Sequence, residues 1–302
     1  MGIDFSSPGR TSARTTLRVD PPVSTAAFVD RVRSLGPVDD IENCYDTDLS
    51  GATFAERAAP GGVEDRFDDT VERMAVASFS FSTDRQVSYM ELGDPTVRER
   101  IETDERTVTI VYHEDGYAFV SGPGGRTATE GETVARRLFG TEDIESVDVD
   151  EPFLRWLVWR AHSGDELASG FDICRVTGAR VVGGGPPEEF QLTGAEPLGS
   201  EQPRRFLERV RDGHRIDRVD GDFRLEGVDL HGYVSSYAGL GASLQDSEHS
   251  ETGGTEVLLG VLFCLRVVEL FERRSALEEP ARTLPSAFED ALEAALADTG
   301  DG

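Results

Sequence analysis

The sequence predicts an α+β protein built mainly from antiparallel sheets with packed helices and divided into two subdomains. Three observations support this prediction. Strand patterns dominate residues 76–121 and include a clear hairpin, which joins antiparallel strands. Both tryptophans lie in one strongly apolar helical segment near the middle of the chain. The 302 residues, 38% of them hydrophobic, suffice for one large domain or two ordinary ones with real cores.

We expect three regions along the chain. Residues 1–14 lack periodic hydrophobicity and are expected to form a mobile arm. Residues 15–149 are expected to form an N-terminal α+β domain. Residues 150–300 are expected to form a C-terminal α+β domain centred on the helix that holds the tryptophans.

The N-terminal domain begins with a strand at Thr15–Asp20, which we expect to stop at Pro21 and Pro22 because proline interrupts a sheet ladder. Ser24 or Thr25 can cap the helix that follows. The further elements expected in this domain are strands at 41–45, 76–81, 87–92 and 144–149, an irregular segment at 46–70, a hairpin of 107–113 and 117–121 around Asp115-Gly116, and a helix at 132–139.

The helix expected at Asp150–His162 is the predicted centre of the second domain. Asp150 or Glu151 can cap its N-terminus. Its apolar residues cover nearly the whole circumference, which predicts burial on several sides. Because two tryptophans carry a large apolar area, neighbouring elements are expected to pack around Trp156 and Trp159.

The rest of the chain is expected to add strands and three helices. Asp220-Gly221-Asp222 is interpreted as the turn between two of these strands. The expected elements are strands at 170–176, 179–182, 190–193, 215–219, 223–228 and 230–237, and helices at 203–212, 257–271 and 286–297.

The charge of the chain is unusual. It carries 58 acidic residues against 30 arginines and no lysine, for a formal charge of −28. Acidic residues dispersed over the whole chain indicate a cytoplasmic protein of an extreme halophile, where salt screens their repulsion. An acidic surface made for a basic partner would concentrate them in blocks instead. The absence of lysine excludes Schiff-base, P-loop and kinase chemistry that requires this residue.

The cysteines and the apolar runs indicate the compartment. Cys44, Cys174 and Cys264 are scattered and odd in number, which favours buried thiols in a reducing compartment over a disulfide framework. No signal peptide is visible, and the longest apolar run, Val257–Leu265, is too short to span a bilayer. We therefore expect a cytoplasmic protein with no membrane partner.

Three segments resemble ligand sites, each with a plainer alternative. Residues 46–57 open like an EF-hand calcium loop, but the twelfth position is Arg57, so an ordinary polar turn is favoured. The glycine-rich loop 122–127 around Arg126 could attract an anion or serve as a connector. His162, near Asp165 and Glu166, is an acid–base or metal candidate or a histidine favourably placed at a helix end. No nucleophile is paired with a base, and we expect no catalytic residue, cofactor or metal.

Arginines gather in two places. Residues 203–218 carry six arginines against three acids, and the N-terminal arm carries Arg10 and Arg14 with no acid beside them. Arginine offers a bidentate fork to phosphate, so these islands are candidates for nucleic-acid binding. The alternative is that they pair with carboxylates of the same chain. The candidate nucleic-acid residues are Arg204, Arg205, Arg209, Arg211, Arg215, Arg10 and Arg14.

The tryptophan helix, Phe153-Leu-Arg-Trp-Leu-Val-Trp-Arg160, resembles a helix in the shorter members of RdgC, the recombination-associated DNA-binding family. Elements that follow in a similar order are Leu192-Thr-Gly-Ala-Glu-Pro197, a helix ending in Val210-Arg-Asp-Gly-His214, a hairpin, and an apolar helix ending in Phe271-Glu-Arg-Arg274. This resemblance implies a non-enzymatic protein that binds duplex DNA without sequence preference and self-associates into a ring.

Three functions are therefore open. The first is a non-enzymatic binding protein with duplex DNA as its partner, related to recombination. The second is a protein–protein interaction or scaffold module, which predicts an exposed apolar patch from Val257–Phe271. The third is an enzyme of unrecognised class, with His162 or the loop at Arg126 in its site.

Overall fold

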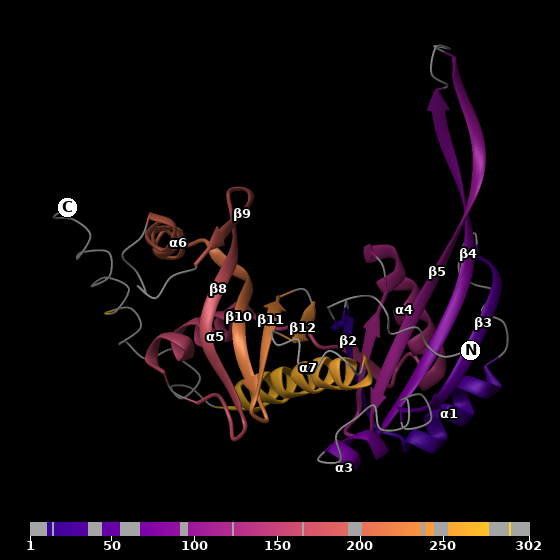
Figure 1. Ribbon diagram of the computed structural model, residues 1–302, viewed down its shortest axis with the longest axis horizontal. Coiled ribbons are helices and arrows are strands. Elements are labelled where there is room, and N and C mark those ends of the chain that lie inside the picture. The colour runs from indigo at the N-terminus through magenta and orange to yellow at the C-terminus, as the bar shows by residue number, and fades with distance from the viewer. Residues whose placement is uncertain are drawn as a thin grey trace. The chain divides into compact units, whose positions relative to one another are not determined.

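A computed structural model confirms the α+β class: two six-stranded antiparallel sheets are packed against helices (Figure 1). The structure describes residues 11–13, 15–35, 44–54, 67–90, 96–122, 124–164, 166–192, 201–236, 239–244, 253–277 and 290. Three predictions lie outside these residues: the segment 193–197, Arg10 and Arg14. Of the helix expected at 286–297, only residue 290 is described.

The helices and strands follow one another in an irregular order. They are β1 (Thr11–Ala13), β2 (Thr15–Val19), α1 (Thr25–Ser34), β3 (Cys44–Thr53), α3 (Asp68–Glu72), β4 (Met74–Met90), β5 (Val97–His113), β6 (Tyr117–Ser121), α4 (Gly124–Phe139), β7 (Ile144–Ser146), α5 (Glu151–Ser163), β8 (Phe171–Gly183), β9 (Gly185–Gln191), α6 (Glu201–Arg211), β10 (Arg215–Leu225), β11 (Val228–Ser235), β12 (Leu240–Leu244) and α7 (Gly253–Ser275).

The chain divides into two compact units. The first spans Arg14–Ser146, and the second comprises Val147–Gly302 together with Phe5–Ala13. The second unit therefore includes β1, which pairs with β12 through Thr11↔Ala242 and Ala13↔Leu240. The sequence predicts a mobile arm over residues 1–14, but Thr11–Ala13 is an edge strand, because the backbone groups of β12 are available for pairing there.

The first unit has a sheet with the strand order β3-β4-β5-β6-β2-β7 and a core shared with α1 and α4. As expected, Ser24 caps α1 by accepting a hydrogen bond from the Ala27 amide. The rings of Tyr112, Phe28 of α1 and Phe139 of α4 form a three-membered cluster, with centroids 5.1–5.5 Å apart. These aromatic rings join both helices to the middle of the sheet.

Two predictions for the first unit are wrong in part. Residues 46–70 are not wholly irregular, because Asp46–Thr53 continues β3 and Asp68–Glu72 forms α3. The two strands expected at 76–81 and 87–92 are one strand, β4, which pairs with β5 over its full length from Met74↔His113 to Met90↔Val97. The hairpin of β5 and β6 is confirmed, with Gly116 at φ +88° in its turn.

The far halves of β4 and β5 form a two-stranded ribbon that runs well beyond the other strands of the unit (Figure 1). The side chains of Met90, Val97 and Ile101 on this ribbon are 62–71% exposed. All three lie on one face of the ribbon, because Met90 is opposite Val97, and Ile101 follows Val97 by four residues.

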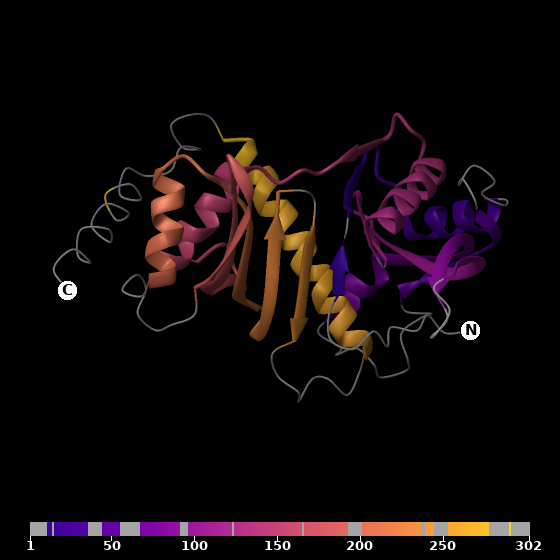
Figure 2. The ribbon, with the colours of Figure 1, turned by 90° about the horizontal axis from the view of Figure 1, so that it is seen from above.

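The second unit has a sheet with the strand order β1-β12-β11-β10-β8-β9. Its helices α5, α6 and α7 pack on one face: Phe263 of α7 contacts Phe171 and Phe223 of the sheet, and Phe206 of α6 contacts Phe190 of β9. The third helix, α5, contacts β8 and β10 and meets α7 on the same face. Figure 2 shows α7 crossing the strands obliquely.

The apolar circumference of the tryptophan helix predicts burial on several sides, and this prediction is wrong. Asp150 caps it through the Phe153 amide and Gly164 ends it, as expected, but Trp156 and Trp159 are only half-buried. The Trp156 ring lies against the guanidinium groups of two arginines, Arg160 and Arg274. The Trp156 ring also contacts Phe153, so it has a cationic side and an apolar side, and both half-buried tryptophans lie at the margin of the core.

The core of the second unit is centred on α7 instead. Leu258, Leu259, Phe263 and Val268 are all fully buried in this helix. The exposed apolar patch that the interaction hypothesis predicts at Val257–Phe271 is therefore wrong, since the sheet and α5 cover these side chains. Over the described residues, no helix combines the length and the hydropathy needed to cross a membrane.

The buried thiol of Cys264 gives a test of the α7 packing. Burial raises the pKa of Cys264 to about 12. Compared with the ordinary value of 9.0, the reactive thiolate is about a thousandfold rarer at neutral pH. In a variant with Cys44→Ser and Cys174→Ser, we expect maleimide to label Cys264 only as the protein unfolds. Labelling followed by mass spectrometry along a urea series measures this, and rapid labelling without urea would contradict the packing.

Candidate functional site

The second face of the second unit's sheet is the candidate site, because no helix among the described residues covers it. Side chains alternate between the two faces of a strand. Along β10, Val219, Phe223 and Leu225 lie on the helix side, so their neighbours lie on the opposite, open face. The register, together with the hydrogen bonds from Arg180 to Asp217, places on this open face five arginines and six acidic residues: Arg175, Arg180, Arg215, Arg218, Arg224, Asp172, Asp217, Asp220, Asp222, Asp229 and Glu189.

Strand β10 is continuous where the sequence predicts a turn. Asp220-Gly221-Asp222 lies in mid-strand, and the chain turns later, at Glu226 and Gly227, which have φ values of +49° and +81°. A Cβ on Gly221 would lie 2.8 Å from the carbonyl oxygen of Arg175 in β8. This glycine is therefore required by close strand packing, and both aspartates lie on the open face.

Arginine and aspartate side chains form four ion pairs across this face. The Arg180 guanidinium donates two hydrogen bonds to Asp217, which is 3% exposed, from Nε at 2.7 Å and from Nη2 at 3.2 Å. The other three pairs are Arg175 with Asp222, Arg218 with Asp220, and Arg224 with Asp229. Because their carboxylate partners are largely buried, the guanidinium groups of Arg180 and Arg218 have fixed orientations, whereas Arg175 and Arg224 are more exposed.

The Asp222 carboxylate accepts hydrogen bonds from two side chains. Its oxygens accept from Nε of Arg175 and lie 3.0 Å from Nδ1 of His231. Burial alone would raise the pKa of Asp222, but the hydrogen bonds and charges of these two partners outweigh burial and hold the pKa below its ordinary value. On the same face, the Ser243 hydroxyl donates a hydrogen bond to the backbone carbonyl of His231 at 3.4 Å.

The lowered pKa of Asp222 makes stability depend on pH in a defined direction. The carboxylate stabilises the folded state above the pKa of an unfolded aspartate, about 3.9, and this stabilisation is lost as pH falls through the lower folded-state pKa. Below about pH 4, we expect the free energy of unfolding to fall more steeply in the wild type than in Asp222→Asn. Urea unfolding at several pH values measures the slopes, with the half-exposed Asp229→Asn as control. Parallel curves for wild type and Asp222→Asn would contradict this account.

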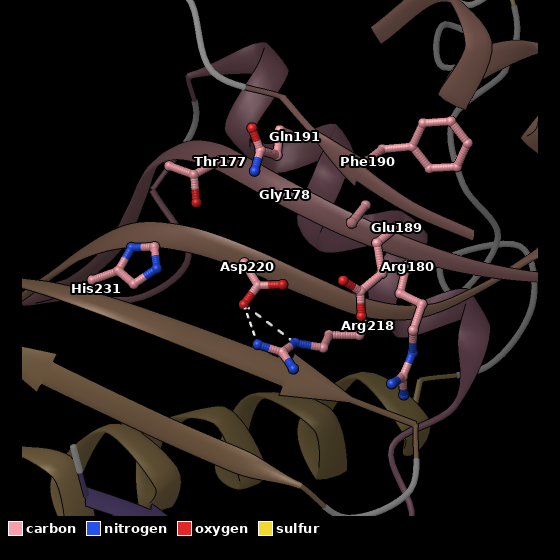
Figure 3. Close-up of a pocket in the computed structure, with 10 residues that line it drawn as sticks. Thr177, Gly178, Arg180, Glu189, Phe190, Gln191, Arg218, Asp220 and His231 are labelled. Atoms are coloured by element: carbon pink, nitrogen blue, oxygen red, sulfur yellow. Dashed lines mark hydrogen bonds and ion pairs between the residues drawn. The ribbon is translucent and has the colours of Figure 1, made fainter. Parts of the chain in front are cut away.

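A hollow of about 800 Å³ lies on the open face over strands β8, β9, β10 and β11. Polar side chains dominate its lining, which Figure 3 shows. The residues that line it are Thr177, Gly178, Ala179, Arg180, Glu189, Phe190, Gln191, Arg218, Asp220 and His231. Its volume is within the range of small-molecule sites.

Two arginines of this hollow are direct cross-strand neighbours, because the register pairs Arg180 of β8 with Arg218 of β10. Arg218 donates from both Nε and Nη2 to one oxygen of Asp220, and its guanidinium lies 4.4 Å from the centroid of the Tyr233 ring. Figure 3 shows the bonded Asp220 and Arg218 beside Arg180. Both guanidinium groups are therefore supported from below by the sheet.

The structure separates the arginines that the sequence groups together. Arg209 of α6 pairs with Glu188 of β9 at 2.8 Å, and Arg211 lies 3.6 Å from Asp212. The exposed Arg205 and Arg215 form no ion pair with any residue that the structure describes. Arg215 lies on the open face, whereas α6 packs on the helix side.

The remaining candidate residues add little evidence for a site. Arg204 and Arg126 lie in α6 and α4, but their side chains are outside the described part of the chain, as are Arg10 and Arg14. His162 is exposed at the end of α5, with its ring 5.8 Å from that of Trp159.

The calcium candidate at 46–57 falls partly within strand β3. Within the described ranges, no three His, Cys, Asp or Glu side chains come close enough together to hold a metal ion.

Sequence reasoning missed the residues that define the open face: Arg175, Arg180, Asp222 and His231. A signal for part of this face was present. Arg218, Asp220, Asp222 and Arg224 alternate with Val219, Gly221 and Phe223, which is the period-two pattern of a strand with one polar face. The glycine between two aspartates favoured the interpretation as a turn. The arginines of β8 had no such signal, because their partners are 37 and 47 residues away.

No protein-family model matches the chain, and no curated protein matches it.

Proposed function

We propose that this chain is a non-enzymatic binding protein that holds duplex DNA, without sequence preference, on the open face of the second unit's sheet. One observation carries the proposal: five arginines in fixed or exposed positions lie together on a sheet face that no described helix covers. Contacts of arginine with phosphate oxygens position a duplex and carry no sequence information. A role in recombination and self-association, which the RdgC resemblance implies, is part of the same proposal.

The local charge of the face supports this proposal in a strongly acidic chain. Five arginines against six acidic residues make the face nearly neutral, whereas the whole chain has 58 acidic residues against 30 basic ones. In the molar salt of a halophile, the Debye length is about 3 Å, so distant carboxylates have little effect on a bound phosphate. Short hydrogen bonds from the face itself then decide whether a polyanion binds.

The ion pairs weaken the prediction that the arginines of residues 203–218 bind nucleic acid. Arg209 and Arg211 have carboxylate neighbours, so they are weaker candidates than Arg215. An arginine that pairs through one edge keeps N–H groups on its other edge, because guanidinium has five donors. Among the five arginines of the face, the most accessible donors for a duplex are therefore Arg215 and the outward edges of Arg175 and Arg224, whose side chains are 68% and 58% exposed.

A second candidate, an interaction module, is favoured by one different observation. Met90, Val97 and Ile101 form an exposed apolar face on the β4–β5 ribbon. A two-stranded ribbon is marginally stable by itself in water, so a protein partner would stabilise it. The double variant Met90→Ser/Ile101→Ser would abolish a pull-down partner without changing DNA affinity if this second function is correct.

Fluorescence anisotropy with a labelled duplex tests the DNA proposal. We expect affinity to fall linearly with salt on a double logarithmic plot and to be equal for scrambled duplexes. Arg215→Gln and Arg224→Gln should each reduce the salt slope by about one. Arg33→Gln is the matched control, since Arg33 is an exposed arginine on α1 of the first unit. Absence of binding at the lowest salt that keeps the protein folded would overturn the proposal.

A further inference from the structure

We propose that the hollow on the open face is a phosphate-binding site in which Arg180 and Arg218 grip one phosphate group together. The inference rests on the proposed function where the phosphate belongs to a DNA backbone. The same chemistry would bind a free phosphate or a phosphate monoester. Either source presents oxygens that accept two hydrogen bonds from each guanidinium fork.

The arrangement of the two arginines is the first argument. Like charges directly opposite each other on neighbouring strands destabilise a sheet. Arg180 and Arg218 are such a pair, on a face that no described helix covers. The Asp217 and Asp220 carboxylates offset part of the repulsion between these two arginines. A doubly charged oxyanion between the two guanidinium groups would offset the rest.

The second argument is that both guanidinium groups are held before any ligand arrives. The buried Asp217 accepts from Nε and Nη2 of Arg180. Asp220 accepts from Nε and Nη2 of Arg218, and Tyr233 supports its plane at 4.4 Å. No described residue accepts from Nη1 of either arginine. Binding therefore costs little side-chain entropy, because the donors are already oriented.

The other side chains of the hollow define what else the ligand meets. Thr177 and Gln191 offer a hydroxyl and an amide, and His231 offers a ring nitrogen, because Asp222 occupies only Nδ1 (Figure 3). Glu189 of β9 is the cross-strand neighbour of Arg180 on its other side and repels an anion. Glu189→Gln should therefore tighten phosphate binding, by about tenfold or less.

Asp217 and Asp220 are positioning residues in this account, and the sign of their effect is the test. Removing a negative charge beside an anion site should tighten binding if charge alone matters. If the carboxylates position the arginines, Asp217→Asn and Asp220→Asn should instead weaken it several-fold. Asp220 is the safer variant, since its side chain is 22% exposed whereas that of Asp217 is 5% exposed. Thermal melts verify that each variant is folded.

The experiment measures two ligands on the full chain: the labelled duplex by anisotropy, and inorganic phosphate by calorimetry at constant ionic strength. We expect Arg180→Lys, which keeps the charge and loses the fork, to weaken both by about tenfold. Arg33→Lys is the control. Asp229→Asn removes a carboxylate that does not line the hollow and should not weaken phosphate binding.

The outcomes separate this inference from the proposed function. If duplex DNA binds and Arg180→Lys and Asp220→Asn behave like their controls, the hollow is not a phosphate site, while the proposed function stands. If phosphate binds through Arg180 and Arg218 but duplex DNA does not bind, the proposed function is wrong, and the hollow takes a free phosphate or phosphate monoester. Tighter binding in Asp220→Asn would overturn the positioning role.

Discussion

Replacing Phe263 with alanine is expected to lower the free energy of unfolding of the second unit by about 3–5 kcal/mol. Phe263 is fully buried in α7 and contacts the rings of Phe171 and Phe223, with centroids 5.9 Å and 4.9 Å away. The substitution removes a large apolar side chain and leaves a cavity between helix and sheet, and both effects destabilise the folded state.

Tryptophan fluorescence during urea unfolding measures this effect, because both tryptophans lie in α5 of the second unit. Leu277→Ala is the control, since Leu277 is 48% exposed and should change stability by less than about 0.5 kcal/mol. Gly232→Ala gives a second check. A Cβ there would lie 2.7 Å from Phe263 Cζ, so this change should cost less when Phe263 is already alanine. Equal costs in both backgrounds would contradict the packing described.

The second large effect is expected at Tyr112 in the first unit. Its hydroxyl accepts from the Val23 amide at 2.7 Å and donates to the Val23 carbonyl at 2.9 Å. Burial raises the pKa of Tyr112, although the hydrogen bond to Val23 opposes this shift. Tyr112→Phe leaves both Val23 groups without their partner, which should lower the free energy of unfolding by about 1–3 kcal/mol.

Circular dichroism during urea unfolding measures this loss. Tyr89→Phe is the matched control, because Tyr89 lies on the ribbon and its ring contacts the Arg100 guanidinium without any hydroxyl bond to a described residue. Its stability should stay within about 0.5 kcal/mol of the wild type. A Tyr112→Phe variant as stable as Tyr89→Phe would show that the Val23 contacts contribute nothing.

Local elements could be predicted from the sequence because their determinants are close together in it. Ser24 and Asp150 cap their helices by accepting from amides three residues later. Gly116 forms the turn of the hairpin that the alternating residues on either side predict. Class α+β follows from the same patterns. In each case a side chain or glycine within a few residues decides the backbone conformation.

The open face could not be predicted, because it depends on contacts between distant strands. Gly221 suggests a turn by its local sequence, but the Arg175 carbonyl requires a glycine in mid-strand. The tryptophan helix was expected at the centre because of its composition. Its rings lie at the margin instead, since Phe263 of α7 takes the central place against Phe171 and Phe223.

The sequence by itself determined the α+β class, the helix caps, the hairpin at Gly116 and the acidic, lysine-free composition. Only the tertiary structure decided that Arg180 and Arg218 meet across two strands, each beside its own aspartate. The physical reason is the distance along the chain over which each interaction acts. Capping and turns act over a few residues, whereas cross-strand pairing depends on register, which is set by burying the opposite face of every strand against the helices.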